Sequence, residues 1–230
     1  ILMSISKNSF KSFPPVAGIL LIASSIQYLI MEQVAASAWV NPPYNFAVNF
    51  ISDLGNPIPN DQFVGKVVNS PFHPMMNLGF ITQGILAMAI TLILWRLIPG
   101  RVRNFVLTLG FAHGAGIILV GTFHENSTVP LAMSVPHYLG AWAAIFGGNL
   151  IAIAVGVIGV RIGASGVYRV ASIALGVIGI VSFAWLLADP VMLATQGGLL
   201  ERIAVYTVLV WQLMTGVTLF LGRTKHGQAA

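Results

Sequence analysis

The chain has no cysteine and very little charge: only 7% of its 230 residues are Asp, Glu, Lys or Arg. The lack of cysteine excludes disulfides, thiolate metal sites and cysteine nucleophiles. A soluble domain usually carries about 25% charged residues, so a soluble fold this poor in charge could not cover its surface. Hydrophobic residues make up 57% of the chain. The sequence therefore predicts that the lipid bilayer is the solvent for most of the protein, because apolar side chains face lipid at no cost.

The arrangement of the positive charges excludes nucleic acid as a partner. The formal net charge is +5, and a basic protein could bind nucleic acid. The Lys and Arg residues, however, stand singly or in small groups between apolar runs and form no basic stripe. We therefore expect membrane lipids, and other membrane subunits, as partners.

Six apolar segments are long enough to cross a bilayer, which takes about 20 residues at about 1.5 Å rise each. They predict an all-α polytopic membrane protein, with a single domain over residues 1–230 that is a bundle of six transmembrane helices. The predicted helices cover residues 14–36, 72–95, 104–123, 136–160, 168–188 and 200–221. The longest connection, residues 37–71, is rich in Asn, Pro and Gly, and loops of this length usually carry function.

The positive residues fall unequally on the two sides of this arrangement and so predict its orientation. One side holds nine of them: Lys7, Lys11, Arg96, Arg101, Arg103, Arg161, Arg169, Arg223 and Lys225. The other side holds Lys66 and Arg202. Because cytoplasmic loops are enriched in Lys and Arg, we expect both termini in the cytoplasm and the 37–71 loop outside, in the cell (cytoplasmic) membrane.

Polar residues gather near the expected outer face. All the acidic residues lie there, namely Glu32, Asp53, Asp61, Glu125, Asp189 and Glu201. His73 opens the second predicted helix, with Asn77 four residues on and thus on the same helix face. His124 follows the third helix and His137 opens the fourth. A short loop makes these two helices antiparallel neighbours, so we expect both histidines at the same depth.

Asp53, His73, His124 and His137 predict a metal site in one interpretation. Catalytic zinc takes three protein ligands and keeps an open position for water, whose pKa falls to about 7. Ser52 or Asp53 could orient that water. In the other interpretation the histidines cap helix ends, bond to loop backbone and face lipid head groups. That interpretation is favoured by the lack of a local spacing such as H-E-x-x-H.

Glu201 and Arg202 open the sixth predicted helix. A carboxylate in a first turn interacts favourably with the helix dipole, which is a sufficient structural role for Glu201. Arg202 is one of the two cations on the acidic side. It could pair with one of the acidic residues Asp53, Glu32 and Glu125, or with a lipid phosphate.

His113 lies in the middle of the third predicted helix, between Gly110 and Gly114. An ionisable group at that depth is a functional candidate by default. The alternative is a neutral histidine that is hydrogen-bonded across a close helix contact, which the small glycines allow. Gln83 is a second polar residue inside the membrane, and we expect it to hold helices together.

Four short sequences resemble one known family. They are Ile51-Ser52-Asp53-Leu54-Gly55, Gly121-Thr122-Phe123-His124-Glu125, His137-Tyr138-Leu139-Gly140-Ala141 and Gly198-Leu199-Leu200-Glu201-Arg202. Their order resembles the prokaryotic multi-pass membrane family known as domain of unknown function 998. The resemblance covers nearly the whole chain and implies that family's fold and membrane location. In the family a proline commonly follows the phenylalanine that ends the third helix, whereas this chain has His124 there.

Three functions stay open at this point. A non-catalytic module would be an accessory subunit of a membrane complex or a lipid-interacting protein with a polar site at the outer face. A metal-dependent hydrolase or transferase would act on a lipid or another amphiphile. Its candidate catalytic residues are Ser52, Asp53, Glu201 and Arg202. A small transporter would need polar groups along a path through the midplane, for which His113, Gln83 and Asn149 are the candidates.

Overall fold

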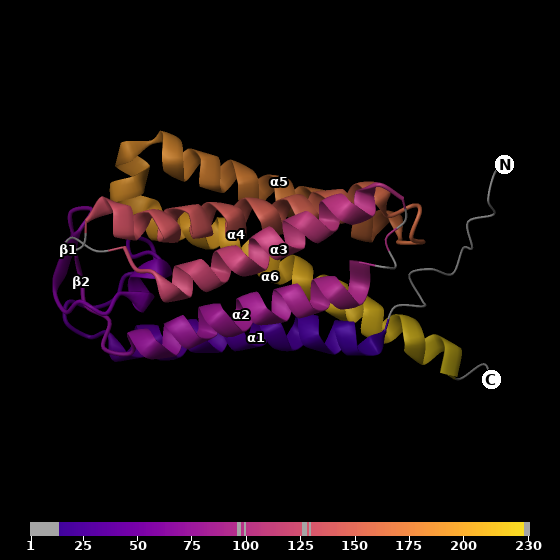
Figure 1. Ribbon diagram of the computed structural model, residues 1–230, viewed down its shortest axis with the longest axis horizontal. Helices are drawn as coiled ribbons and strands as arrows, with labels where there is room; N and C mark the ends of the chain where they lie inside the picture. The colour runs from indigo at the N-terminus through magenta and orange to yellow at the C-terminus, as the bar shows by residue number, and fades with distance from the viewer. Residues whose placement is uncertain (1–13, 96–97, 99, 126–127, 129, 228–230) are drawn as a thin grey trace.

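The computed structural model describes residues 14–95, 98, 100–125, 128 and 130–227. Helices make up most of this part of the chain (Figure 1). They are α1 (Pro15–Ala38), α2 (His73–Leu94), α3 (Val102–Thr122), α4 (Leu131–Ile158), α5 (Gly166–Ala188) and α6 (Pro190–Gly227). Among the described residues, all six are long and apolar enough to cross a membrane. This confirms the predicted all-α polytopic bundle.

The bundle has two distinct ends. The long loop between α1 and α2, residues 39–72, lies at one end, which we call the loop end (Figure 1). The α2–α3 and α4–α5 connections, the start of α1 and the end of α6 lie at the other, the arginine end. Lys7, Lys11 and Arg96, which contribute to the predicted orientation, lie outside the described residues. The cytoplasmic position of the arginine end stays a prediction.

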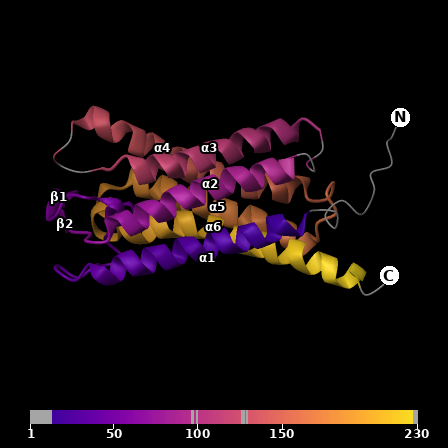
Figure 2. The ribbon, with the colours of Figure 1, turned by 60° about the horizontal axis from the view of Figure 1, so that its bottom comes forward.

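The six helices form a closed ring in chain order. Each packs against the next, and α6 returns to pack against α1 (Figure 2). Glycines allow the close contacts: a Cβ on Gly18 of α1 would lie 2.8 Å from the carbonyl oxygen of Gly216 of α6. A Cβ on Gly116 of α3 would lie 2.5 Å from the carbonyl oxygen of Gly140 of α4. Small residues allow helix backbones to approach closely in lipid. The six helices of the ring leave space along its axis.

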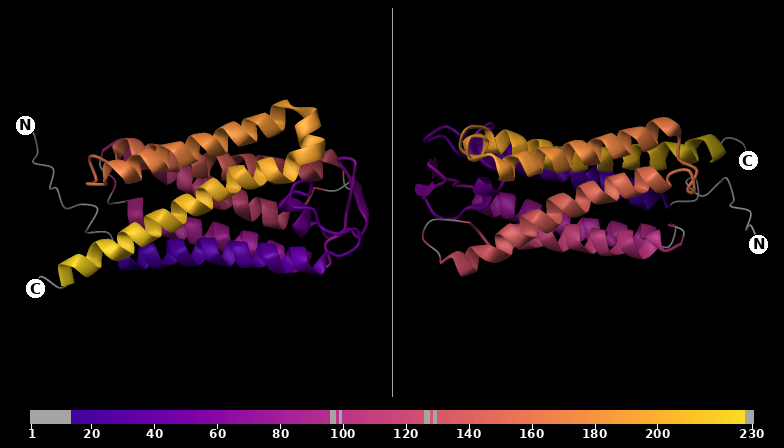
Figure 3. Two further views of the ribbon diagram at one scale, coloured as in Figure 1. Left: turned by 180° about the vertical axis from the view of Figure 1, so that it is seen from behind. Right: turned by 90° about the horizontal axis from the view of Figure 1, so that it is seen from above.

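Two helices begin earlier than the sequence predicts. α4 starts at Leu131 after Pro130, and Pro136 lies inside it rather than at its start. α6 starts at Pro190 rather than near Leu200, because the Asp189 carboxylate caps it by accepting bonds from two backbone N–H groups. At Gln196 the backbone leaves helical geometry, with φ of −136°, and α6 bends there (Figure 3).

The 39–72 loop is part of the hydrophobic core. It contains a 3₁₀ turn, η2 (Ser52–Gly55), and the antiparallel strands β1 (Asp61–Phe63) and β2 (Lys66–Val68). Ile51, Leu54 and Val68 are fully buried and pack into the same cluster as Met76 and Phe80 of α2. The loop therefore closes the loop end of the ring and brings its own polar residues inside.

Candidate functional site

Neighbouring elements hold residues 50–55, the part of the loop around η2, through hydrogen bonds. The backbone N–H of Ile51 donates to the Glu201 carboxylate on α6. The carbonyl oxygen of Gly55 accepts from Asn77 Nδ2 on α2 at 3.0 Å. A Cβ on Gly55 would overlap Asn77 Oδ1, so a larger residue there would displace the Asn77 side chain. These contacts fix η2 between α2 and α6.

Arg202 anchors the loop to both α6 and α1. Its Nε donates to Glu32 Oε1 of α1 at 3.0 Å, and the two side chains are 6% and 0% exposed. The hydroxyl of Tyr206 donates to Glu32 Oε2 at 2.8 Å, and the hydroxyl of Tyr44 accepts from Arg202 Nη2. Nη1 of the same arginine donates to three backbone carbonyls, those of Phe46, Asn49 and Gly198. We call the side chains of Arg202, Glu32, Tyr44 and Tyr206 the Arg202 latch. Of the predicted partners for Arg202, the structure selects Glu32.

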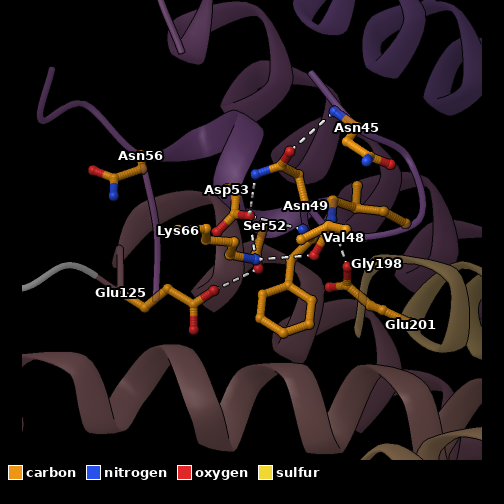
Figure 4. A network of polar contacts seen from close by, with 12 residues as sticks. Asn45, Val48, Asn49, Ser52, Asp53, Asn56, Lys66, Glu125, Gly198 and Glu201 are labelled. Carbon is orange, nitrogen blue, oxygen red and sulfur yellow. Dashed lines mark hydrogen bonds and ion pairs between the residues drawn. The ribbon is translucent and has the colours of Figure 1, made fainter. Parts of the chain in front are cut away.

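Asp53 pairs inside the loop with the second cation of this end (Figure 4). Lys66 Nζ lies 2.6 Å from Asp53 Oδ2 and 3.6 Å from the centroid of the Phe50 ring. Burial raises the pKa of Asp53 to about 6, although the Lys66 ammonium lowers it. Within the described part of the chain, Asp53 Oδ1 has no hydrogen-bond partner. Asp53 is thus oriented toward Lys66 and holds the loop together.

Ser52, Glu125 and His137 form a second polar chain between the loop and α4. The Ser52 hydroxyl donates to Glu125 Oε1 at 2.6 Å (Figure 4). His137 Nε2 lies 3.6 Å from Glu125 Oε2, and its Nδ1 lies 2.8 Å from the carbonyl oxygen of Phe123. Because a carbonyl oxygen can only accept, Nδ1 carries a proton. The histidine therefore presents Nε2 to the glutamate.

These groups line a cavity of about 280 Å³ between the loop, α4, α5 and the start of α6. We call it the loop-end cavity. Its polar lining consists of Ser52, Glu125, His137, Tyr138 and Glu201. Its apolar lining includes Phe50, Trp142, Ile145, Phe183, Leu186 and Leu187. One space thus brings together carboxyl groups and aromatic and aliphatic side chains.

Two smaller cavities lie along the ring axis. The loop-side axial cavity, about 50 Å³, shares Ser52 and Glu201 with the loop-end cavity and reaches inward to Gln83 and His113. The far axial cavity, about 80 Å³, shares His113 with it and reaches Trp95 near the arginine end. His113 lies at the border of the two. Its Nδ1 lies 2.6 Å from the carbonyl oxygen of Ala144, while its buried Nε2 has no partner among the described residues.

Gln83 belongs to a polar network that joins three helices. Its Oε1 accepts from Ser24 of α1 at 2.6 Å, and its Nε2 donates to Gln212 of α6 at 3.1 Å. Ser25 of α1 donates to the same Gln212 amide oxygen at 3.1 Å. Both polar atoms of the Gln83 side chain, Oε1 and Nε2, are therefore hydrogen-bonded. Such bonds between helices stabilise helix association in lipid.

The predicted metal ligands lie in one region but do not converge. Burial lowers the pKa of His124, and the charges that His137 and His73 carry when protonated lower it further, so the three histidines are within electrostatic reach. Asp53 is oriented toward Lys66 instead. Over the described residues, no three His, Asp or Glu side chains form a group that could hold a metal ion.

The sequence patterns do not single out two side chains on which the site depends, Tyr44 and Tyr206, because neither has a local signal. Glu125 stands among the acidic residues of the predicted outer face, but its pairing with Ser52 is not predicted. Lys66 does have a local signal: a cation isolated among acidic residues on the less positive side calls for an acidic partner. The partner itself, Asp53, depends on how the loop folds back on itself.

The fold and this site define a class: a multi-pass membrane protein whose helix ring is closed at one end by an ordered loop with a buried Arg–Glu anchor. The sequence model of the family described as "Protein of unknown function (DUF998)" matches residues 21–218, and the chain belongs to this family. The match runs from α1 into the last turns of α6 and so includes the whole site. No curated protein and no solved structure matches the chain.

Proposed function

We propose that this protein binds an amphiphilic molecule, a lipid or a lipid-like compound, in the loop-end cavity. One observation carries the proposal: the cavity lining combines polar and apolar side chains in a single space. Ser52, Glu125 and His137 are among its polar residues, and Trp142 and Leu187 are among its apolar ones. An amphiphile likewise combines a polar head group with an apolar chain, and ligand sites pair apolar walls with a few placed polar groups.

The position of the cavity gives an amphiphile access from the bilayer. Trp142 of α4 and Leu187 of α5 line the cavity, and each is 49% exposed on the outer surface of the ring. The cavity volume of about 280 Å³ is near the lower end of ligand sites, which span about 300–1,000 Å³. The site thus fits a head group and the first part of a chain, and the rest of the chain stays in lipid. Within the non-catalytic reading, this favours lipid interaction over a purely structural subunit.

A photoreactive monoacylglycerol, with a diazirine near its head group, tests the proposal. The purified protein in phosphatidylcholine nanodiscs is irradiated and its adducts are located by mass spectrometry. We expect adducts on the cavity wall at Trp142 or Leu187. Ala141→Phe fills the cavity that Ala141 lines and should remove them. Ala115→Phe adds the same bulk on an exposed position of α3 and should leave them unchanged.

Adducts spread evenly over the lipid-facing residues of all helices would contradict the proposal. So would wall adducts that persist in Ala141→Phe while the variant keeps the thermal stability of the wild type.

The axial cavities favour a second candidate function, the movement of protons through the bundle. His113 Nε2 is an unpartnered acceptor among the described residues and lies where the two axial cavities meet. This nitrogen could accept a proton from a donor in one cavity and release it to an acceptor in the other, without rotation of the imidazole. Ionisable groups at this depth commonly mark proton pathways.

Proteoliposomes with an internal pH dye and an imposed potassium diffusion potential test this second function. Proton uptake by the wild type should disappear in His113→Phe. It should persist in His124→Phe, which removes a histidine that does not line the axial cavities. Liposomes with wild-type protein that take up protons no faster than empty liposomes would rule the function out.

A further inference from the structure

Carboxyl groups are the main charged side chains that line the loop-end cavity. Its titratable lining residues are two carboxyl groups, Glu125 and Glu201, together with His137 and the Tyr138 hydroxyl. Among the residues described as lining it there is neither a lysine nor an arginine. A phosphate or carboxylate head group would therefore meet carboxyl groups without a cation to bind it.

The two cations of the loop end are fully engaged elsewhere. Lys66 Nζ contacts Asp53, stacks over the Phe50 ring and donates to the carbonyl oxygen of Val48 at 3.2 Å. Arg202 donates to Glu32, to Tyr44 and to three backbone carbonyls. Releasing either cation toward a ligand would leave a buried carboxylate unpaired, which is strongly unfavourable.

His137 is engaged by Glu125 and by the loop backbone. Its Nδ1 lies 2.8 Å from the carbonyl oxygen of Phe123, which can only accept, so Nδ1 is the donor of that contact. Its Nε2 lies 3.6 Å from Glu125 Oε2. Both ring nitrogens of His137 thus face other parts of the protein and are not directed to an anionic ligand.

Glu201 is the second carboxyl group of the cavity wall. Its Oε2 accepts from the Ile51 N–H, and a positive charge beside it would favour its ionised form. Its neighbour in sequence, Arg202, is directed to Glu32. A carboxylate in an apolar surrounding gains most from a ligand that brings a positive charge and hydrogen-bond donors together.

We infer that the loop-end cavity selects amphiphiles with an ammonium head group, as in a long-chain amine, over those with a phosphate or carboxylate. The inference rests on the proposed function, since it names the head group for the same cavity. The ammonium would contact Glu201 and the Ser52–Glu125 side of the wall, and the chain would pass between Trp142 and Leu187 into the bilayer.

Competition with chain-matched probes tests the inference. Dodecylamine, dodecanol and dodecyl phosphate compete with the photoreactive monoacylglycerol in phosphatidylcholine nanodiscs, and each concentration is corrected for its partitioning into empty nanodiscs. Since a like charge across an interface is strongly disfavoured, we expect dodecylamine to compete at least about tenfold better than dodecyl phosphate. Glu201→Gln keeps an acceptor for Ile51 and should abolish most of this preference. Asp189→Asn removes an acidic residue of the same end outside the cavity and should preserve it.

The outcomes separate this inference from the function on which it rests. If the monoacylglycerol gives no adducts in the cavity, the proposed function fails and the inference falls with it. If it does, but dodecyl phosphate or dodecanol competes as well as dodecylamine, amphiphile binding stands and the ammonium selectivity is overturned. A preference unchanged in a well-folded Glu201→Gln variant would overturn the assignment to Glu201.

Discussion

The Arg202–Glu32 pair is the clearest test of stability at the scale of single residues. Both side chains are buried, and removing one partner leaves the other as an uncompensated charge. We expect Glu32→Ala and Arg202→Ala each to lower the free energy of unfolding by about 3–5 kcal/mol. The double variant should lose less than the sum, since the second substitution removes the stranded charge. Unfolding in mixed detergent micelles with increasing dodecyl sulfate measures all three.

Arg202→Lys serves as the control for geometry, because lysine keeps the charge but lacks the planar set of donors that reaches three carbonyls. It should fall well short of wild-type stability. Wild-type stability in Arg202→Lys, or strictly additive losses in the double variant, would show that the latch is not a coupled unit.

Asp53 predicts a dependence of stability on pH. Burial raises its pKa from an ordinary value of 3.8 to about 6, so the folded protein binds this proton more tightly than the unfolded chain. The stabilisation from the proton is complete below pH 3.8 and is lost as the pH rises through about 6. Wild type should therefore lose stability relative to Asp53→Asn between about pH 4 and 7, on the order of 3 kcal/mol. Thermal unfolding of both proteins measures this across the pH range. The prediction is contradicted if the stability of wild type and that of Asp53→Asn change with pH in parallel.

Sequence reasoning reaches the members of the site better than their pairing. Ser52, Arg202 and His137 stand out because polar residues are scarce in this chain, so each one demands an explanation. Which acid meets which cation depends on the path of the 39–72 loop, and the loop has no periodic pattern to predict it. The metal hypothesis put His124 beside His137 from helix topology alone, but a shared depth does not fix the directions of the side chains.

At the scale of elements, the loop depends on one glycine of α6. A Cβ on Gly198 would overlap the carbonyl oxygen of Asn49 and lie 2.8 Å from that of Phe46. Both carbonyls also accept from Arg202, so Gly198→Ala should push the loop off the latch. Hydrogen exchange over residues 45–56 should then rise. The matched variant Gly166→Ala, where nothing lies within 4 Å of the added Cβ, should leave exchange there unchanged.

Equal protection of residues 45–56 in the wild type and in Gly198→Ala would mean that the loop holds its place without this close contact. The capping of α6 illustrates the related limit of sequence reasoning. Asp189 followed by Pro190 is a helix-start signal, yet the paired glycines after Gln196 suggest a loop. The structure uses both signals, because the helix starts at the first and bends at the second.

At the scale of the whole molecule, the orientation can be tested directly because the chain has no cysteine. Gln62→Cys places a thiol on an exposed position of the 39–72 loop, and Val160→Cys places one at the arginine end, where the native residue is 65% exposed. The positive-inside rule predicts that a membrane-impermeant maleimide labels position 62 on intact cells and position 160 only after lysis. The reverse pattern would invert the predicted topology.

The closed ring itself could not be predicted from the sequence. Hydrophobic segments predict spans because length and composition suffice, but a helix in lipid is apolar on its outer face as well as its inner one. The amphipathic pattern that shows which face of a helix packs against its neighbour in a soluble protein is therefore weak here. Glycine pairs such as Gly18 with Gly216 fix the closure between α1 and α6, and they become a pair only in three dimensions.

The α1–α6 closure also has a consequence for how the protein is made. Glu32 enters the membrane with the first helix, and its partner Arg202 follows 170 residues later, with the last. During synthesis Glu32 of α1 has no counterion until α6 has been inserted, so the buried Arg202–Glu32 pair forms only after α6 is present. A product truncated before α6 would therefore keep an uncompensated acid near the end of a membrane helix, which is costly, and it should be less stable than the finished protein.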